Sequence, residues 1–170
     1  MFGNPVVGYI AKEGSVVEAN AFRVTSTFAE HVASGRGPGV DIGNGACGAP
    51  VFAMNPGRVT LAGLLGTAKV VRIMAPDGVY ETGYAHLATI LVKVGQVVIR
   101  GQQVGTLGAT GATACHLHIG LKKSGVEVDS QPLWDQTMWE GKAVAAATAT
   151  LQADIVGLKA RLASIKTIAS

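Results

Sequence analysis

The chain has 170 residues, of which 48% are hydrophobic and 15% charged, with a formal net charge of +3. This composition excludes intrinsic disorder of the whole chain and leaves room for one domain with an appendage. The 14 Lys and Arg are spread along the chain, so they do not form the clustered basic patch of a nucleic-acid-binding protein.

Two further classes of segment are not expected. No stretch approaches about 18 consecutive apolar residues, which excludes membrane insertion through a transmembrane helix. Residues 1–15 also lack the basic and apolar regions of a signal peptide, so we expect no export of this chain by that route.

Residues 1–22 predict an N-terminal β segment, and residues 23–135 predict the principal domain. All glycines except Gly141 and Gly157 lie before residue 136, where they separate short β-branched and apolar runs. Turn signals recur about every 8 to 12 residues, which favours an antiparallel, mainly β sandwich or barrel. We expect almost no helix before residue 130.

Residues 136–170 differ in composition and predict one long C-terminal α-helix. They are rich in Ala, Leu and Lys and contain no proline. The positions from Val144 to Ala169 that step alternately by four and three are apolar except for Thr148, which is the heptad pattern of a coiled coil. The narrow stripe favours self-association or docking into a larger assembly; the alternative is packing against the β domain of the same chain.

Three of the four histidines lie in chemically suggestive segments: His86 in GYAHLATI, and His116 and His118 in ATACHLHIGL. Residues two apart on a strand face the same side, so the last two would place their imidazoles together, as in metal sites. Asp41, in GPGVDIG, is the best candidate for a carboxylate at the same site. His31 has no such context.

Three isolated cations, Arg58, Lys69 and Arg72, fall in predicted strands. An isolated charge on a strand usually faces solvent. We therefore expect them to lie on solvated strand faces.

Three runs resemble the lysostaphin/LytM-type zinc metallopeptidase domain between about Arg23 and Pro132. They are RVTSTFAE, GVDIGNGACGAPVFA and ETGYAHLATILVKVGQVVIRGQQVGTLGATGATACHLHIGL. The resemblance implies a twisted antiparallel β-sheet groove of the duplicated hybrid motif type. It also implies peptidoglycan as the substrate, and the weakly basic balance of the chain suits an anionic partner such as a bacterial wall.

The resemblance implies a set of site residues, but the set is one ligand short. In that family the zinc is held by the His and Asp of an H-x-x-x-D motif and by the second His of H-x-H. Asp41 and His118 match two of these ligands, and His86 and His116 match the catalytic histidines. Gly37 stands four residues before Asp41, in place of the third ligand, although a catalytic zinc typically has three protein ligands.

Two routes could complete the site. His31, ten residues before Asp41, could fold back through the GRGPG segment, or His86 or His116 could be recruited at the cost of its catalytic role. The favoured expectation is a groove that keeps its histidines, binds no zinc and has little or no activity.

The resemblance also suggests a disulfide between Cys47 and Cys115. Some members of the family carry cysteines in segments similar to ACGAPV and ACHLH. The alternative is two buried thiols.

Taken together, these features predict a peptidoglycan-directed module associated with a bacteriophage virion, of the tail-tip type, and non-catalytic or weakly active. Its C-terminal helix would bind other tail proteins or a second copy, and the virion would deliver it to the host cell wall. The first alternative is an active zinc endopeptidase that cleaves peptidoglycan cross-bridges, such as a phage lysin. The second is a degenerate LytM regulator of a wall amidase.

Overall fold

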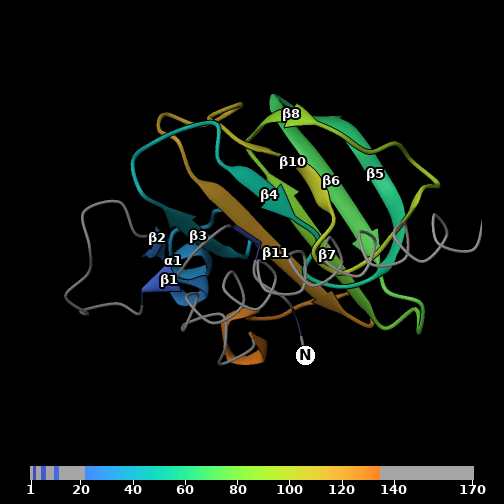
Figure 1. Cartoon of the computed structure of the whole chain (residues 1–170). Helices are drawn as coiled ribbons and strands as arrows, with labels where there is room; N and C mark the ends of the chain where they lie inside the picture. Colours follow the sequence, from blue (N-terminus) through green and yellow to red (C-terminus); the bar gives the residue numbers. More distant parts are fainter. Residues whose placement is uncertain (1, 3–4, 7–9, 12–21, 135–170) are drawn as a thin grey trace, which may run out of the picture.

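The computed structural model of the chain describes residues 2, 5–6, 10–11 and 22–134 (Figure 1). These residues form mainly antiparallel β-sheets with very little helix, so the predicted fold class is confirmed for this part of the chain. The predicted helix over residues 136–170 lies outside the described residues, as does most of the predicted N-terminal segment. No described helix is long and apolar enough to cross a membrane.

The larger sheet has nine strands among the described residues. Its order is β1 (Ile10–Ala11), β2 (Phe22–Ser26), β3 (Val40–Gly43), β11 (Leu117–Lys123), β7 (Tyr80–Ala85), β6 (Ala68–Met74), β5 (Gly57–Leu65) and β9 (Val97–Val98), with β12 (Val126–Glu127) beside β11. The first two strands pair in parallel, and the other pairs are antiparallel.

A smaller sheet contains three strands in the order β4 (Pro50–Phe52), β10 (Gln103–Leu107) and β8 (Leu87–Ile90). Figure 1 shows it over one face of the larger sheet, and one cluster of buried apolar side chains includes residues of both sheets. Burial of this apolar surface is the main force that holds the two sheets together.

Strand β11 shows how the core positions the site. Leu117, Ile119 and Leu121 are fully buried, whereas the residues between them are half-buried. Because side chains alternate between the faces of a strand, the half-buried residues lie on the face opposite the core. The groove face of β11 therefore presents His118, Gly120 and Lys122.

One short helix, α1 (Phe28–Ala33), follows β2, in the part of the chain where the sequence predicts almost no helix. A capping box starts it: the Thr27 amide donates to Glu30 Oε2 at 2.6 Å, and the Glu30 amide donates to Thr27 Oγ1 at 3.3 Å. This reciprocal pairing satisfies amides at the helix N-terminus that would otherwise lack partners. The helix places His31 against β3 and β11.

The last described residues form a short 3-10 helix, η1 (Gln131–Leu133), followed by Trp134. The indole is buried, and the backbone of this residue forms a bridge with Phe2. The start and the end of the described chain therefore lie side by side.

Candidate metal centre

All four histidines of the chain gather around Asp41. This aspartate lies on β3 directly opposite His118 of β11, and its side chain is 8% exposed. His116 immediately precedes β11, His86 occupies the turn between β7 and β8, and His31 comes from α1. The sheet register thus brings together Asp41, His86, His116 and His118, the candidates named from the sequence.

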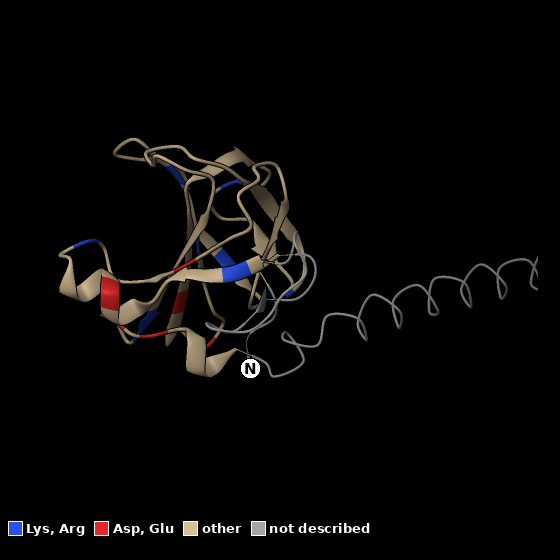
Figure 2. Cartoon of the chain, turned by 90° about the vertical axis from the view of Figure 1, so that its left-hand side faces the viewer, with Lys and Arg blue, Asp and Glu red and all other residues tan. Residues whose placement is uncertain are grey.

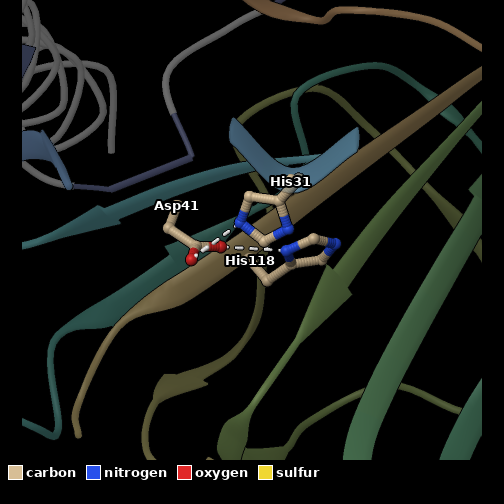
Figure 3. A group of neighbouring side chains, drawn as sticks. All are labelled: His31, Asp41 and His118. Carbon is tan, nitrogen blue, oxygen red and sulfur yellow. Dashed lines mark hydrogen bonds and ion pairs between the residues drawn. The ribbon is translucent and has the colours of Figure 1, made fainter. Parts of the chain in front are cut away.

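Three of these residues form a compact group (Figure 3). His31 Nε2 lies 2.9 Å from Asp41 Oδ2, and His118 Nδ1 lies 2.9 Å from Asp41 Oδ1. One ligand atom from each residue can be chosen so that all lie within 4.8 Å of one another. Two imidazoles and one carboxylate are a donor set that suits a catalytic zinc ion, which keeps its remaining position open.

The hydrogen bonds of His31 support this assignment. Its Nδ1 atom lies 2.9 Å from the carbonyl oxygen of Gly37, which can only accept, so the proton is on Nδ1. In the neutral ring, the Nε2 atom then carries a lone pair that faces Asp41. That atom is buried and makes no hydrogen bond within the described structure, because its contact with the carboxylate lacks hydrogen-bond geometry. A metal ion would satisfy it.

Gly37 therefore has a different place from the one expected. The sequence pattern assigned it the position of a missing ligand, and the structure shows its carbonyl supporting the ring of His31. The structure brings His31 back beside Asp41, as the first of the two routes requires, and its role as a zinc ligand stays a prediction. The expectation that the site binds no zinc stays a prediction, which metal analysis can decide.

His86 and His116 form a second pair beside the group of three, with ring centroids 4.6 Å apart. Their Nδ1 atoms lie 2.8 Å from the Thr110 carbonyl oxygen and 3.0 Å from the Ala114 carbonyl oxygen, respectively. Each neutral ring therefore presents Nε2 as an acceptor. His86 also has a positive φ of 64°, a strained conformation for a residue other than glycine, which is typical of functional sites.

The electrostatics of the site keep Asp41 charged and His86 neutral. Burial alone would raise the pKa of Asp41, but the hydrogen bond with His118 and the close contact with His31 outweigh it and lower this pKa below its usual value. Burial lowers the pKa of His86, and the neighbouring His116 and His118 lower it further against the opposing hydrogen bond to Thr110. At neutral pH the site therefore offers an ionised carboxylate and a neutral imidazole.

A disulfide joins Cys47 to Cys115, with their Cα atoms 5.2 Å apart. This is the pairing that the family resemblance suggested. The bond ties the loop after β3 to the residue before His116. It thus links the segment that carries Asp41 to the segment that carries the two closely spaced histidines.

A pocket of about 210 Å³ adjoins His118 and is lined by residues of β6, β7, β11 and β12. Arg72 is half-buried on β6 and lines this pocket. Lys69 Nζ donates to the Ala88 carbonyl, and Arg58 Nη1, on an exposed side chain, donates to the Gly95 carbonyl. Figure 2 shows that basic and acidic residues are scattered over the described ribbon.

Comparison with known proteins agrees with this site. The sequence model of Peptidase family M23 matches residues 35–130. This range contains Asp41, His86, His116 and His118 but begins after His31. The catalytic domain of lysostaphin from Staphylococcus simulans superposes with a TM-score of 0.52 at 33% identity, over 56% of this chain and 76% of that domain.

Two curated relatives are also similar. The peptidoglycan DD-endopeptidase ShyB of Vibrio cholerae is 39% identical over 84 residues, 49% of this chain and 20% of ShyB. The murein hydrolase activator NlpD of Escherichia coli is 35% identical over 109 residues, 63% of this chain and 28% of NlpD. Other relatives are named lipoproteins. The chain spans less than half the length of these curated relatives, and its matched domain shows that it belongs to peptidase family M23.

Proposed function

We propose that this chain is a zinc-dependent endopeptidase that cleaves the peptides of bacterial peptidoglycan, with His31, Asp41 and His118 as the zinc ligands. The convergence of these three side chains, with the buried Nε2 atom of His31 lacking a hydrogen bond, is the observation that carries the proposal. The zinc dependence of the M23 family and the likeness to ShyB support it.

Bound zinc would polarise the scissile carbonyl and lower the pKa of a coordinated water molecule. In their neutral rings, His86 and His116 present Nε2 as an acceptor, and the Nε2 atom of His116 lies 3.7 Å from Asp41 Oδ2. They are placed to orient the attacking water and to take its proton. When the C–N bond breaks, the imidazole that holds this proton can pass it to the leaving amine.

Replacement of His31 tests the ligand set. We expect the wild-type chain to bind one zinc ion and to cleave peptidoglycan peptides. His31→Ala should lower zinc affinity by more than the 10- to 100-fold typical of a lost supporting partner, because a ligand itself is removed. Gly37→Ala is the control, since a Cβ there meets no atom within 4 Å and the supporting carbonyl remains.

Elemental analysis and release of soluble peptides from purified peptidoglycan would measure both properties. Stoichiometric zinc in His31→Ala would contradict the ligand assignment. A wild-type chain that takes up no zinc would instead support the non-catalytic module expected from the sequence.

The likeness to NlpD, which is named a murein hydrolase activator, favours regulation as the second candidate function. A regulator would stimulate a separate amidase without cleaving peptides itself. A chain that binds peptidoglycan, hydrolyses none of it and accelerates an added amidase would support this function.

We also propose that residues 136–170 attach the module to a second copy or to other virion proteins. The heptad repeat supports this proposal, since a narrow apolar stripe suits a helical partner. Deletion of residues 141–170 should leave a folded monomer and abolish self-association or incorporation into particles. Light scattering and recovery in assembled phage measure these outcomes, and an unfolded truncation would assign the segment to the β-domain core.

A further inference from the structure

The pocket beside His118 has a floor made largely of backbone. Gly120 on β11 pairs with Gly83 on β7, and Gly83 pairs with Arg72 on β6. Cross-strand partners point to the same face of a sheet, and Gly120 lies two residues after His118. A row of two glycines therefore leads from the candidate metal centre to Arg72. Figure 1 shows the three strands side by side.

The fold does not require either glycine. A Cβ on Gly83 would lie 3.8 Å from the Gly120 carbonyl oxygen and 3.9 Å from Arg72 Cγ, which are ordinary contacts. A Cβ on Gly120 would lie 3.9 Å from the Pro38 carbonyl oxygen, and neither glycine has a positive φ. Glycine within a strand often marks the close approach of another backbone or a ligand. The space above this floor suits an extended peptide.

Arg72 differs from the other charged groups that line the pocket. Lys122 pairs with Glu127 at 3.5 Å, and Glu81 accepts a hydrogen bond from Thr60 Oγ1 at 2.7 Å. Among the described residues, Arg72 forms no hydrogen bond or ion pair. Its half-buried guanidinium is thus a planar, charged donor without a partner at the end of the glycine floor.

We propose that Arg72 binds a carboxylate of the substrate, and so directs the enzyme toward peptides that carry a free carboxylate on this side of the cleaved bond. This inference rests on the proposed function. Guanidinium matches a carboxylate with two parallel hydrogen bonds, which neither a neutral amide nor a cation can accept in the same way.

The register sets the distance between the carboxylate and the cleaved bond. Strands about 4.8 Å apart place the Cα of Arg72 roughly 10 Å from that of Gly120, which itself lies about 7 Å along β11 from His118. The Cα of Arg72 is therefore roughly 12 Å from that of His118. An extended peptide advances about 3.3 to 3.6 Å per residue. The bound carboxylate therefore belongs to roughly the third or fourth residue from the scissile bond, either as a side group or as the C-terminus of the stem peptide.

Three muropeptides distinguish these two sources: one with all carboxylates free, one amidated only at the C-terminus and one amidated only at the internal stem carboxylates. Calorimetry with the metal-free full-length chain measures binding without turnover. We expect one of the two amidated muropeptides to bind the wild-type chain about 10- to 100-fold more weakly than the free one, as for loss of a charged hydrogen bond. The Arg72→Gln variant should bind all three muropeptides with the low affinity that the wild-type chain shows for the weakly bound amidated one.

Arg58→Gln is the matched control, because the Arg58 guanidinium donates to the Gly95 carbonyl away from the pocket. It should keep the wild-type preference. Gly83→Ala should weaken binding of all three peptides without a change in thermal stability, because the added methyl group occupies space in the pocket without a clash with the protein. Equal affinities of the wild-type chain for the three peptides, absence of binding, or wild-type binding by Gly83→Ala would overturn the proposed recognition.

Cleavage by the zinc-loaded chain separates this inference from the proposed function. If the enzyme is active, Arg72→Gln should raise KM for the free peptide about 10- to 100-fold and change kcat little, because the contact is remote from the reacting atoms. If the wild-type chain cleaves nothing, the proposed function fails, and the binding preference still decides the role of Arg72.

Discussion

The Nδ1 atom of His31 lies 2.9 Å from the carbonyl oxygen of Gly37. Gly37 has no side chain that could bind a metal, but its backbone carbonyl orients the His31 ring, which we propose as the third zinc ligand. Such a hydrogen bond fixes the tautomer and the orientation of a metal-binding histidine. His31 reaches the site from α1, which precedes the matched family domain, and its ring is held in place before any metal binds.

Gly39 is the tightest backbone position near the site, and Gly39→Ala should disrupt it. A Cβ there would clash with the His118 imidazole and lie 2.8 Å from the Ile119 carbonyl oxygen. The ring would have to leave its place beside Asp41. We expect zinc affinity to fall by at least 10-fold, as measured by competition with a chromogenic chelator.

Gly37→Ala, two residues away, supplies the comparison for that substitution. Its Cβ would point into open space, so zinc affinity and thermal stability should remain near the wild-type values. Equal zinc affinities for the two variants would show that the crowding at Gly39 does not position the His118 ring.

The regular part of the site could be predicted from the sequence, because strands obey a simple alternation. His116 and His118 were expected on one face, and the structure places both beside Asp41. The antiparallel register of β3 and β11 supplies the rest, since it sets Asp41 opposite His118.

The sequence does not favour His31 as a ligand, because it lies ten residues before Asp41, with the GRGPG segment between them, and no motif contains it. The helix that carries it is also too short for a periodic pattern. The six residues of α1 do not complete two turns. The available signal was Thr27 followed three residues later by Glu30, which is the pattern of a capping box. The pocket position of Arg72 could not be predicted either, because it depends on strand order.

Thr27→Ala should weaken zinc binding from outside the site. The substitution removes the Oγ1 cap of α1 and about 1 kcal/mol of stability. Because the helix is short, its fraying should displace His31, so we expect lower zinc affinity. The amount of zinc bound per chain at saturating zinc should change little. Thr27→Ser keeps the capping hydroxyl and should restore affinity. Zinc titrations of both variants provide the measurement, and equal weakening in both would contradict a capping role.

The disulfide should contribute mainly to stability. Cys47 and Cys115 are separated by 68 positions, and closing such a loop in the unfolded chain is worth about 4 kcal/mol in the chain-entropy model. A Cys47→Ser, Cys115→Ser double variant should therefore have a markedly lower Tm. Reductant should lower the Tm of the wild-type chain alone. Two free thiols in denatured, never-reduced protein would contradict the pairing.

Tyr84 should make stability fall at alkaline pH. Its hydroxyl is buried, accepts a hydrogen bond from the Met54 amide at 2.7 Å and donates to Thr82 Oγ1 at 3.2 Å. Burial raises the pKa of Tyr84 to about 12, above the value of about 10 for tyrosine in an unfolded chain. The unfolded chain therefore loses this proton first. The contribution of the neutral phenol is complete below pH 10 and is lost as the pH rises toward 12.

Tyr84→Phe removes this titration and also leaves the Met54 amide without its acceptor. At pH 8 we expect the free energy of unfolding to fall by about 1 to 3 kcal/mol, the cost of one buried unsatisfied donor. Between pH 8 and pH 11 the variant should lose less stability than the wild-type chain, because it has no phenol to ionise at this position. Urea unfolding at the two pH values measures both effects, with Tyr80→Phe as the control for loss of a half-buried hydroxyl. The same alkaline loss in Tyr84→Phe and the wild-type chain would assign that loss to other groups.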